Sequence, residues 1–420
     1  MVVRAVRQFF VFSAALGVFA FLGLGSGCGS QSNPNAATSG SGTGSGAGGS
    51  PAGSGGSGPT GSGGSGSGTG TSPAAGAYVY VSLGSGAIQG YSASSSGALT
   101  PVSGSPFPAP GVNALGTNGT FLFAAESSQN IITFSIGSSG ALSQTSTINA
   151  QAHNTYVTDG GPLSLFTDPK GLDVYDNDIY ADGANSRYQA FGVQSGGALT
   201  YSGVTTYGDT QQRVLSFTAD DSSAYGADCY HGGDYIYGFM RNASGALTYF
   251  DPKASLPTPP SGEGYCIGGT AVSPDNHVVI ALGESPDGYQ VGSSQLAVYT
   301  INPSDGSLTT TDTSATMPTD QVGSVNDYRF DPAGDTLAVA GQSGVQIYGY
   351  SAGKLAAEGG PLTADPISKV EWDTTGHLYA LSMSTGKLYA FSVANGAATP
   401  VSGSPYAVSS PGDLAVVPVS

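Results

Sequence analysis

A short glycine-x-leucine-threonine element recurs through most of this 420-residue chain, and no other feature constrains the fold as strongly. Seven copies, of which the last two are weaker, begin at Gly97, Gly140, Gly197, Gly245, Gly306, Gly353 and Gly396. They are 43 to 61 residues apart. A period of roughly 40–50 residues is typical of one four-stranded blade of a β-propeller. The repeat therefore predicts an all-β chain with seven four-stranded antiparallel blades.

The residues before each copy support strands rather than helices. An aromatic residue in an alternating segment lies five to seven positions before each glycine, as Tyr91 and Phe134 do. Earlier strands end in tight turns of the kind seen at Phe330-Asp331-Pro332-Ala333-Gly334. Asp, Pro and Gly supply the dihedral angles that such turns need. Short alternating strands with this punctuation, and no helical period, indicate an all-β fold.

The two ends of the repeat region predict how the ring closes. The region opens at Ala77 with what corresponds to the second strand of a blade, Tyr78–Val81. Its last segment, Asp413–Val417, resembles a first strand with nothing after it. If this strand completes the first blade, no long strand edge stays exposed. We therefore expect the propeller to occupy 77–420, with innermost strands starting near 112, 163, 213, 269, 326, 368 and 413.

The N-terminal region predicts export. Arg4 and Arg7 precede an apolar run that is too short for a membrane span and ends at Cys28. Residues 1–28 thus have the pattern of a signal peptide. The segment before Cys28 resembles the bacterial lipobox, which implies a lipid anchor on Cys28. Ordinary cleavage nearby, which would release the protein, is the alternative. Gly29 replaces the Asp that marks inner-membrane lipoproteins, so this resemblance implies an outer-membrane protein of the cell envelope.

A tether separates the anchor from the propeller. Residues 29–76 contain 18 Gly and 12 Ser, with no charged and no aromatic residue. Such a segment cannot bury enough apolar surface to offset the chain entropy lost on folding. The sequence therefore predicts a disordered linker, and the lipid is the only predicted contact with the membrane.

Charge narrows the range of partners. The chain has 28 acidic and 11 basic residues, a formal net charge of −17. A surface of this sign repels phosphate backbones and anionic headgroups, which excludes nucleic acid as a partner. Proteins, glycans, neutral lactones and cations remain open as ligands.

The strand motifs resemble one propeller family. Phe121–Ala125 resembles a Tyr-Val-Ala-Asn strand, and the segment 100–107, Thr-Pro-Val-Ser-Gly-Ser-Pro-Phe, recurs at 399–406 with a final Tyr. Together they resemble the lactonase, or YVTN-repeat, seven-bladed propellers over about 77–418. Active members of that family resemble 6-phosphogluconolactonase or fungal lactone-forming cycloisomerases, in which His, Arg and acidic residues surround the central channel.

The family motif carries over only in part. Matching positions give His153, Asp182, Arg187 and Arg213 as the candidate catalytic residues, and both arginines are expected to face the channel. A second Asp and a His of the motif are missing, and Asp228-Cys229 replaces an Asn-Glu pair. Losing a base and a carboxylate weakens the case for hydrolysis, which needs both proton transfer and stabilisation of an oxyanion.

Acidic residues and one histidine are expected on a single face of the ring. The loops after second strands open on that face, and they hold the candidate ligand-binding residues Glu126, Asp228, His231 and Glu284. Oxygen-rich loops of this kind suit a hard divalent cation, the only cofactor considered. A solvated acidic rim is the alternative. His277 and His377 are expected to be loop or turn residues.

Two cysteines remain once Cys28 is assigned to the lipid. Cys229 lies after a second strand and Cys266 lies in the connection to the next blade. Export permits disulfides, so the sequence predicts a Cys229–Cys266 bond. Two separate free thiols are the alternative.

Two functions follow from these observations. The first is an envelope-anchored binding or surface-interaction module. The second is a lactonase, a carboxylic ester hydrolase acting on a sugar lactone; a neutral lactone suits the acidic domain better than a phosphorylated one. No motif supports redox chemistry.

Overall fold

The fold comes from a computed structural model that describes residues 76–153, 164–179, 186–207, 214–230, 233–262, 264–285 and 292–419. All of them belong to the second of two compact units, Thr69–Ser420. The predicted signal peptide and lipidation site at Cys28 lie outside these residues, and so does the predicted tether up to residue 75. No helix in the described part of the chain is long and apolar enough to cross a membrane.

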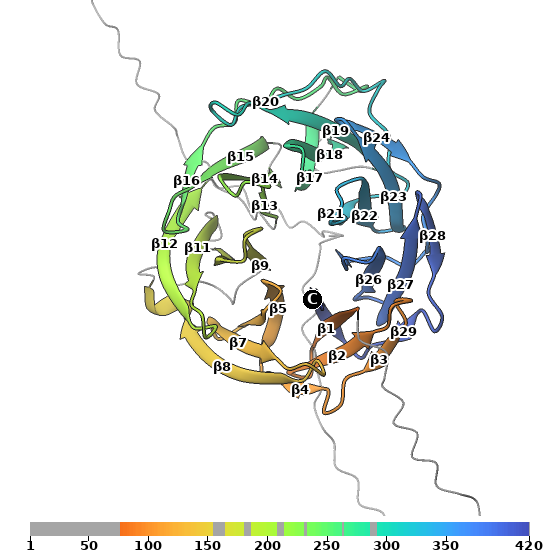
Figure 1. Ribbon diagram of the computed structural model, residues 1–420. Coiled ribbons are helices and arrows are strands. Elements are labelled where there is room, and N and C mark those ends of the chain that lie inside the picture. The colour runs from red at the N-terminus through yellow and green to blue at the C-terminus, as the bar shows by residue number, and fades with distance from the viewer. Residues whose placement is uncertain are drawn as a thin grey trace, which may run out of the picture. The chain divides into compact units, whose positions relative to one another are not determined.

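Seven antiparallel sheets surround a central channel, and this confirms the predicted propeller (Figure 1). Blade 1 contains β30 (Pro411–Pro418), β1 (Ala77–Leu83), β2 (Ala87–Ala93) and β3 (Leu99–Pro101), with β4 (Phe107–Pro108) also paired to β2. Blade 2 contains β5 (Val112–Thr117), β6 (Phe121–Glu126), β7 (Asn130–Ile136) and β8 (Leu142–Asn149), followed by the 3₁₀ helix η1 (Ala150–His153). Blade 3 contains β9 (Ser164–Thr167), β10 (Asp173–Ile179), β11 (Ser186–Val193) and β12 (Leu199–Tyr207).

The other four blades follow the same order from the channel outward. Blade 4 contains β13 (Ser216–Phe217), β14 (Ser223–Tyr230), β15 (Gly233–Arg241) and β16 (Leu247–Phe250). Blade 5 contains β17 (Gly264–Val272), β18 (His277–Ser285), β19 (Ser294–Ile301) and β20 (Leu308–Thr309). Blade 6 contains β21 (Val325–Phe330), β22 (Thr336–Gly341), β23 (Gly344–Ser351) and β24 (Lys354–Ala357). Blade 7 contains β25 (Lys369–Trp372), β26 (His377–Ser382), β27 (Lys387–Ala394) and β28 (Ala397–Pro400), with β29 (Tyr406–Ala407) paired to β27.

The last strand closes the ring, as predicted. β30 pairs with β1 in antiparallel register, with Tyr78 opposite Val417 and Ser82 opposite Asp413. The innermost strands begin within three residues of the expected positions, with one exception. β17 begins at Gly264, five residues early, because its pairing with β18 already starts there, with Gly264 opposite Ser285. The propeller is thus held together by hydrogen bonds between its first and last strands.

The apolar core consists of layers between neighbouring blades. One layer joins blade 1 to blade 2 and includes Tyr80, Ile88, Leu122 and Phe134. Successive side chains of a strand point to opposite faces of its blade. Since each face packs against a neighbouring blade, both faces of the inner strands are apolar. Trp372 is buried in the layer between blades 6 and 7.

The repeat glycines form the joints between blades. All seven adopt positive φ, between 73° and 86°, where a side chain is strained. A Cβ atom on each would meet a side chain from the preceding blade, such as Tyr78 at 2.5 Å for Gly140 and His377 at 2.5 Å for Gly97. Tyrosine hydroxyls of the preceding blade donate to the carbonyls of Gly140, Gly245 and Gly306, each at 2.8 Å. The element that revealed the repeat therefore also docks each blade on the one before it.

Candidate functional site

The central channel is the main candidate site. Three cavities of about 340, 210 and 450 Å³ lie along the innermost strands, from their first residues to their last. Asn113 and Lys369, near the starts of their strands, line the first cavity. Leu115 and Leu165 line the second, and Thr167 and Phe330 line the third. Arg329 in β21 contributes to all three, so its side chain occupies the middle of the channel.

Charged side chains gather on one side of this channel. We call this set the charged wall; it consists of Asp327, Arg329, Lys369, Glu371 and Asp413, from blades 6, 7 and 1. The Nε of Arg329 donates to Glu371 Oε1 at 3.4 Å, and its Nη1 lies 3.5 Å from Asp327 Oδ1. The Nζ of Lys369 lies 3.8 Å from Asp413 Oδ1. Leu115, Leu165 and Leu215 also line the middle cavity, but they are at most 7% exposed, because their side chains belong to the core layers between blades.

Two of the carboxylates also hold the blades together. Asp413 Oδ2 accepts the N–H of Leu115 at 2.8 Å, which links blade 1 to blade 2. Asp327 Oδ2 accepts the N–H of Val370 at 3.1 Å, which links blade 6 to blade 7. Such charge-assisted bonds fix the position of each carboxylate. Asp327 and Asp413 therefore have a structural role that does not require a ligand.

Burial changes the acid–base behaviour of the wall. It raises the pKa of Glu371 and of Asp413 above the usual range, since water cannot fully stabilise their charges there. Burial acts in the opposite direction on Lys369, but the nearby Asp413 and Asp327 keep the pKa of its ammonium raised. The Glu371 side chain nevertheless keeps 33% of its surface exposed and that of Arg329 keeps 26%, so both remain accessible from the channel.

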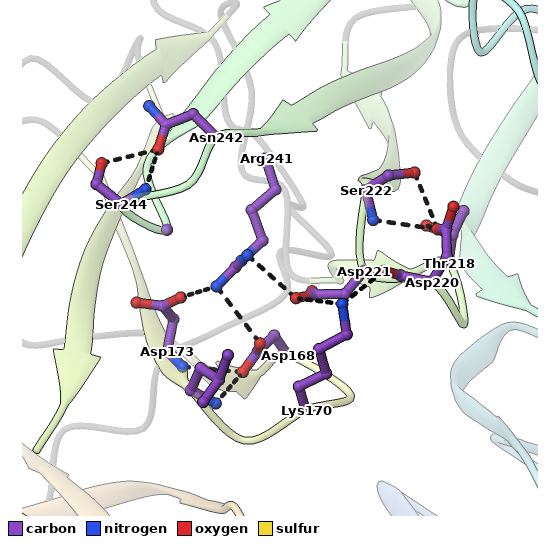
Figure 2. Close-up of polar contacts among 12 residues, drawn as sticks. Asp168, Lys170, Asp173, Thr218, Asp220, Asp221, Ser222, Arg241, Asn242 and Ser244 are labelled. Atoms are coloured by element: carbon purple, nitrogen blue, oxygen red, sulfur yellow. Dashed lines mark hydrogen bonds and ion pairs between the residues drawn. The ribbon is translucent and has the colours of Figure 1, made fainter.

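A second polar cluster lies between blades 3 and 4, at the end of the channel where the innermost strands finish (Figure 2). We call it the Arg241 cluster; it contains Arg241, Asp168, Asp173, Asp221 and Lys170. The guanidinium of Arg241 forms an ion pair with Asp173, lies 3.1 Å from Asp221 Oδ2 and 3.6 Å from Asp168 Oδ2. The Nζ of Lys170 donates to the carbonyl of Asp220 at 2.9 Å and lies 3.9 Å from Asp221. Burial, together with the charge of Asp168, raises the pKa of Asp221 to about 6.

The predicted catalytic residues have very different positions. Arg187 lies in β11, is fully buried and lines none of the three channel cavities. Its backbone carbonyl accepts from Asn177 at 3.4 Å. His153 is the last residue of η1, but its side chain is outside the described part, as are Asp182 and Arg213 entirely. The proposed catalytic roles therefore stay predictions.

The predicted ligand-binding residues are spread over several blades. Glu126 ends β6 and accepts from Ser128 at 2.8 Å and from Asn130 at 3.0 Å. Glu284 lies in β18, opposite Tyr265 in β17. Asp228 lies in β14 without a described side chain, and His231 is outside the described residues. Among the side chains that the structure does describe, no group of three or more His, Cys, Asp or Glu residues is placed to hold a metal ion.

The remaining histidines lie at the turns between first and second strands. His277 and His377 begin β18 and β26. The Nδ1 of His377 lies 2.9 Å from Asp373 Oδ2, and that of His277 lies 3.2 Å from Asp275 Oδ1. In each case the partner is an aspartate of the preceding turn. These placements agree with the turn roles expected from the sequence.

Sequence reasoning did not single out the charged wall. A signal was present, because Asp327 and Arg329 alternate in one expected innermost strand, and Lys369 and Glu371 alternate in the next. Alternate residues share one face of a strand. Charges at this spacing in strands that surround a channel point into it or toward the neighbouring blade.

The comparisons with known proteins agree with the fold. No family model matches the chain, and no curated protein does. A solved structure from Bacteroides uniformis, named as a candidate 6-phosphogluconolactonase, superposes with a TM-score of 0.62 at 15% identity, covering 81% of this chain and 99% of that one. A similarly named protein from Bacteroides fragilis gives 0.60 at 16% identity, covering 81% and 98%. A protein from Lactobacillus plantarum gives 0.61 at 15% identity, covering 81% and 99%. At the level of fold, the chain is therefore similar to these propellers, as its strand motifs predicted.

Proposed function

We propose that this protein is an envelope-anchored binding module that takes a small polar ligand into its central channel. The observation that carries the proposal is the position of Arg329, which lines three successive cavities along the channel. Ligand sites are commonly concave, partly apolar and equipped with a few converging polar groups. The charged wall supplies the converging polar groups, and the channel around it is concave.

Binding without catalysis fits the residues better than hydrolysis does. The family motif is incomplete in the sequence, and Arg187, one of its two retained arginines, is fully buried and lines none of the three channel cavities. A hydrolase would need a base and an oxyanion-stabilising group beside one ester carbonyl.

A ligand screen with a blocked channel tests the proposal. Asn113 lines the first cavity and its side chain is exposed, so Asn113→Trp should fill that end without disturbing the core. We expect thermal stabilisation by the ligand to be lost in this variant and kept in Ser143→Trp, which places the same ring on the outer strand β8 of the same blade. Equal binding by both variants would place the ligand elsewhere.

The anchor is a separate part of the proposal. It is supported by the lipobox-like segment that ends at Cys28 and by the glycine- and serine-rich segment that follows. Cells expressing the chain should incorporate labelled palmitate into it, and Cys28→Ser should abolish the label. Labelling that persists in Cys28→Ser would contradict lipidation at this residue.

Lactone hydrolysis is the second candidate function. The names of the two Bacteroides proteins favour it, as does the Arg329–Glu371 pair in the channel. A neutral sugar lactone is the preferred substrate because the chain is strongly acidic. The test is hydrolysis with and without Ca²⁺ or Mg²⁺, in the native chain and in Arg213→Ala. A rate that exceeds background and falls by orders of magnitude in the variant would favour the enzyme.

A further inference from the structure

Arg329 has far more hydrogen-bonding capacity than the protein around it uses. A guanidinium carries five N–H donors in a planar fork. Among the described residues, Arg329 donates one hydrogen bond, to Glu371 at 3.4 Å, and makes one looser contact with Asp327 at 3.5 Å. A guanidinium inside a ring of blades is normally satisfied by carboxylates or other acceptors. Its side chain keeps 26% of its surface exposed and lines all three cavities, so a ligand in the channel can reach it.

A second cation faces the same space. Lys369 and Arg329 both line the first cavity, where Asp413 and Asp327 outweigh burial and the repulsion from Arg329 and keep the pKa of the Lys369 ammonium raised. The partner of Lys369 is Asp413, at 3.8 Å, which is longer than a hydrogen bond. Two positive groups that repel each other across one cavity are stabilised when an anion lies between them.

We propose that Arg329 and Lys369 form a subsite for a small organic monoanion, a carboxylate, inside the channel. The inference rests on the proposed binding function and specifies the chemistry of its ligand. A planar carboxylate matches the fork of Arg329, and Lys369 adds a point charge.

The acidic members of the wall set the limit on ligand charge. Asp327, Glu371 and Asp413 stand against two cations, so a dianion such as phosphate meets more repulsion than a monoanion does. Asp327 and Asp413 are engaged by backbone N–H groups, which reduces their effect on the ligand. Burial raises the pKa of Glu371, which means that its negative charge is poorly stabilised there.

The rest of the cavity fits a ligand with hydroxyl groups. Asn113, Asn326 and Ser368 line the first cavity beside Lys369. Its volume of about 340 Å³ lies within the range of roughly 300–1,000 Å³ that is usual for small-molecule sites. A hydroxylated carboxylate would place its charge on Arg329 and its hydroxyl groups on these side chains.

Calorimetric titration of the full chain with gluconate, glucitol, acetate and inorganic phosphate tests the proposal. Glucitol keeps the hydroxyl groups of gluconate and lacks its carboxylate. Gluconate should bind at least tenfold more tightly than glucitol, and more tightly than phosphate. Arg329→Gln and Lys369→Gln should each weaken gluconate binding, the former at least tenfold, as expected for loss of a charge-assisted hydrogen bond. Lys354→Gln removes an exposed cation on β24 of the same blade as Arg329 and should change nothing.

One variant should act in the opposite direction. Glu371→Gln removes the carboxylate that competes for Arg329, so it should tighten gluconate binding several-fold. If Glu371 had only a structural role, this substitution would not tighten binding. The subsite is overturned if gluconate and glucitol bind equally, if phosphate binds best, or if neither gluconate nor acetate binds. If gluconate and glucitol bind equally and Asn113→Trp blocks the binding of both, the channel still binds the ligand and only the carboxylate subsite is rejected. If no compound in the ligand screen binds, both the proposed binding function and the carboxylate subsite are rejected. If Arg329→Gln fails to fold, Lys369→Gln and Glu371→Gln decide the question.

Discussion

The hydroxyl of Tyr80 in blade 1 donates a hydrogen bond of 2.8 Å to the carbonyl of Gly140 in blade 2. Gly140 has φ of 80°, and a Cβ atom on it would lie 2.5 Å from the ring of Tyr78. The joint between these two blades thus depends on the absence of a side chain at one repeat position.

Gly140→Ala should therefore destabilise the whole propeller. Strain at positive φ costs about 1–2 kcal/mol and overpacking about 1–3 kcal/mol, so we expect a loss of about 2–5 kcal/mol in denaturant unfolding. Gly119→Ala is the matched control, because Gly119 has φ of 83° and nothing within 4 Å of its added Cβ. The control should show only the conformational cost. Equal losses in both variants would mean that contact with Tyr78 does not matter.

Removing 411–420 should unfold the ring rather than fray one blade. The deletion removes β30, in which Leu414, Val416 and Val417 are at most 6% exposed. At about 1.5–3 kcal/mol for each large apolar side chain, this approaches the total stability of a typical domain, about 5–15 kcal/mol. The measurement is loss of the cooperative thermal transition. Deletion of residues 419–420, which follow β30, is the control and should keep that transition; a cooperative transition in the longer deletion would contradict closure by β30.

The Arg241 cluster should make stability fall as pH rises through about 4 to 6. The folded pKa of Asp221 is about 6, above the ordinary value of 3.8 for an aspartate, so the folded state binds the proton more tightly than the unfolded state does. Asp221 therefore stabilises the folded state in acid, and this stabilisation is lost as the pH rises from about 4 to 6. We expect a loss of about 1–2 kcal/mol, less than the full conversion of the shift because water around Lys170 screens the site.

Asp221→Asn should flatten this part of the pH profile. Stability measured by denaturant unfolding at several pH values, as the difference between variant and native chain, isolates the group from all other acids. Asp220→Asn is a control of opposite sign, since hydrogen bonds from Thr218 and Ser222 lower the pKa of the Asp220 carboxyl. A native profile that Asp221→Asn leaves unchanged would show that Asp221 titrates normally.

The pairing of Cys229 with Cys266 remains a prediction, and the backbone geometry favours it. β14 packs against β17, and Thr270 Oγ1 donates to the carbonyl of Tyr225 at 2.8 Å. The two strands run in opposite directions, because first and second strands of blades are antiparallel. Cys229 lies four residues after Tyr225, and Cys266 lies four before Thr270. Both cysteines are thus expected near the same height along the channel.

Mass spectrometry of alkylated, non-reduced peptides will decide whether this bond forms. A linked peptide pair is expected, and two alkylated thiols would refute the bond. The disulfide would close a loop of 37 residues and stabilise the fold by about 3–4 kcal/mol through restriction of the unfolded chain. Cys229→Ser should lower stability by about that amount.

The sequence predicted the ring well because its signals are local. Tight turns and the Gly140-type repeat mark every blade, and Asp413–Val417 could be assigned to β30 by noting which strand was missing. β4 and β29 were not foreseen, although both belong to the recurring 100–107 and 399–406 segments, since two-residue strands leave no periodic pattern. The charged wall was missed for another reason: whether Arg329 faces the channel depends on strand register, which only the assembled ring defines.

Asp413 and Leu115 bond to each other across 298 positions of the sequence. A contact of this span forms only after a very large loop closes, which is slow and entropically costly. During synthesis, blades 2 to 7 can form as separate units, but the wall that holds Arg329 and Lys369 stays open until the final strand arrives. A growing chain therefore exposes an incomplete charged channel until the propeller is finished, and ligand binding would report on completed folding.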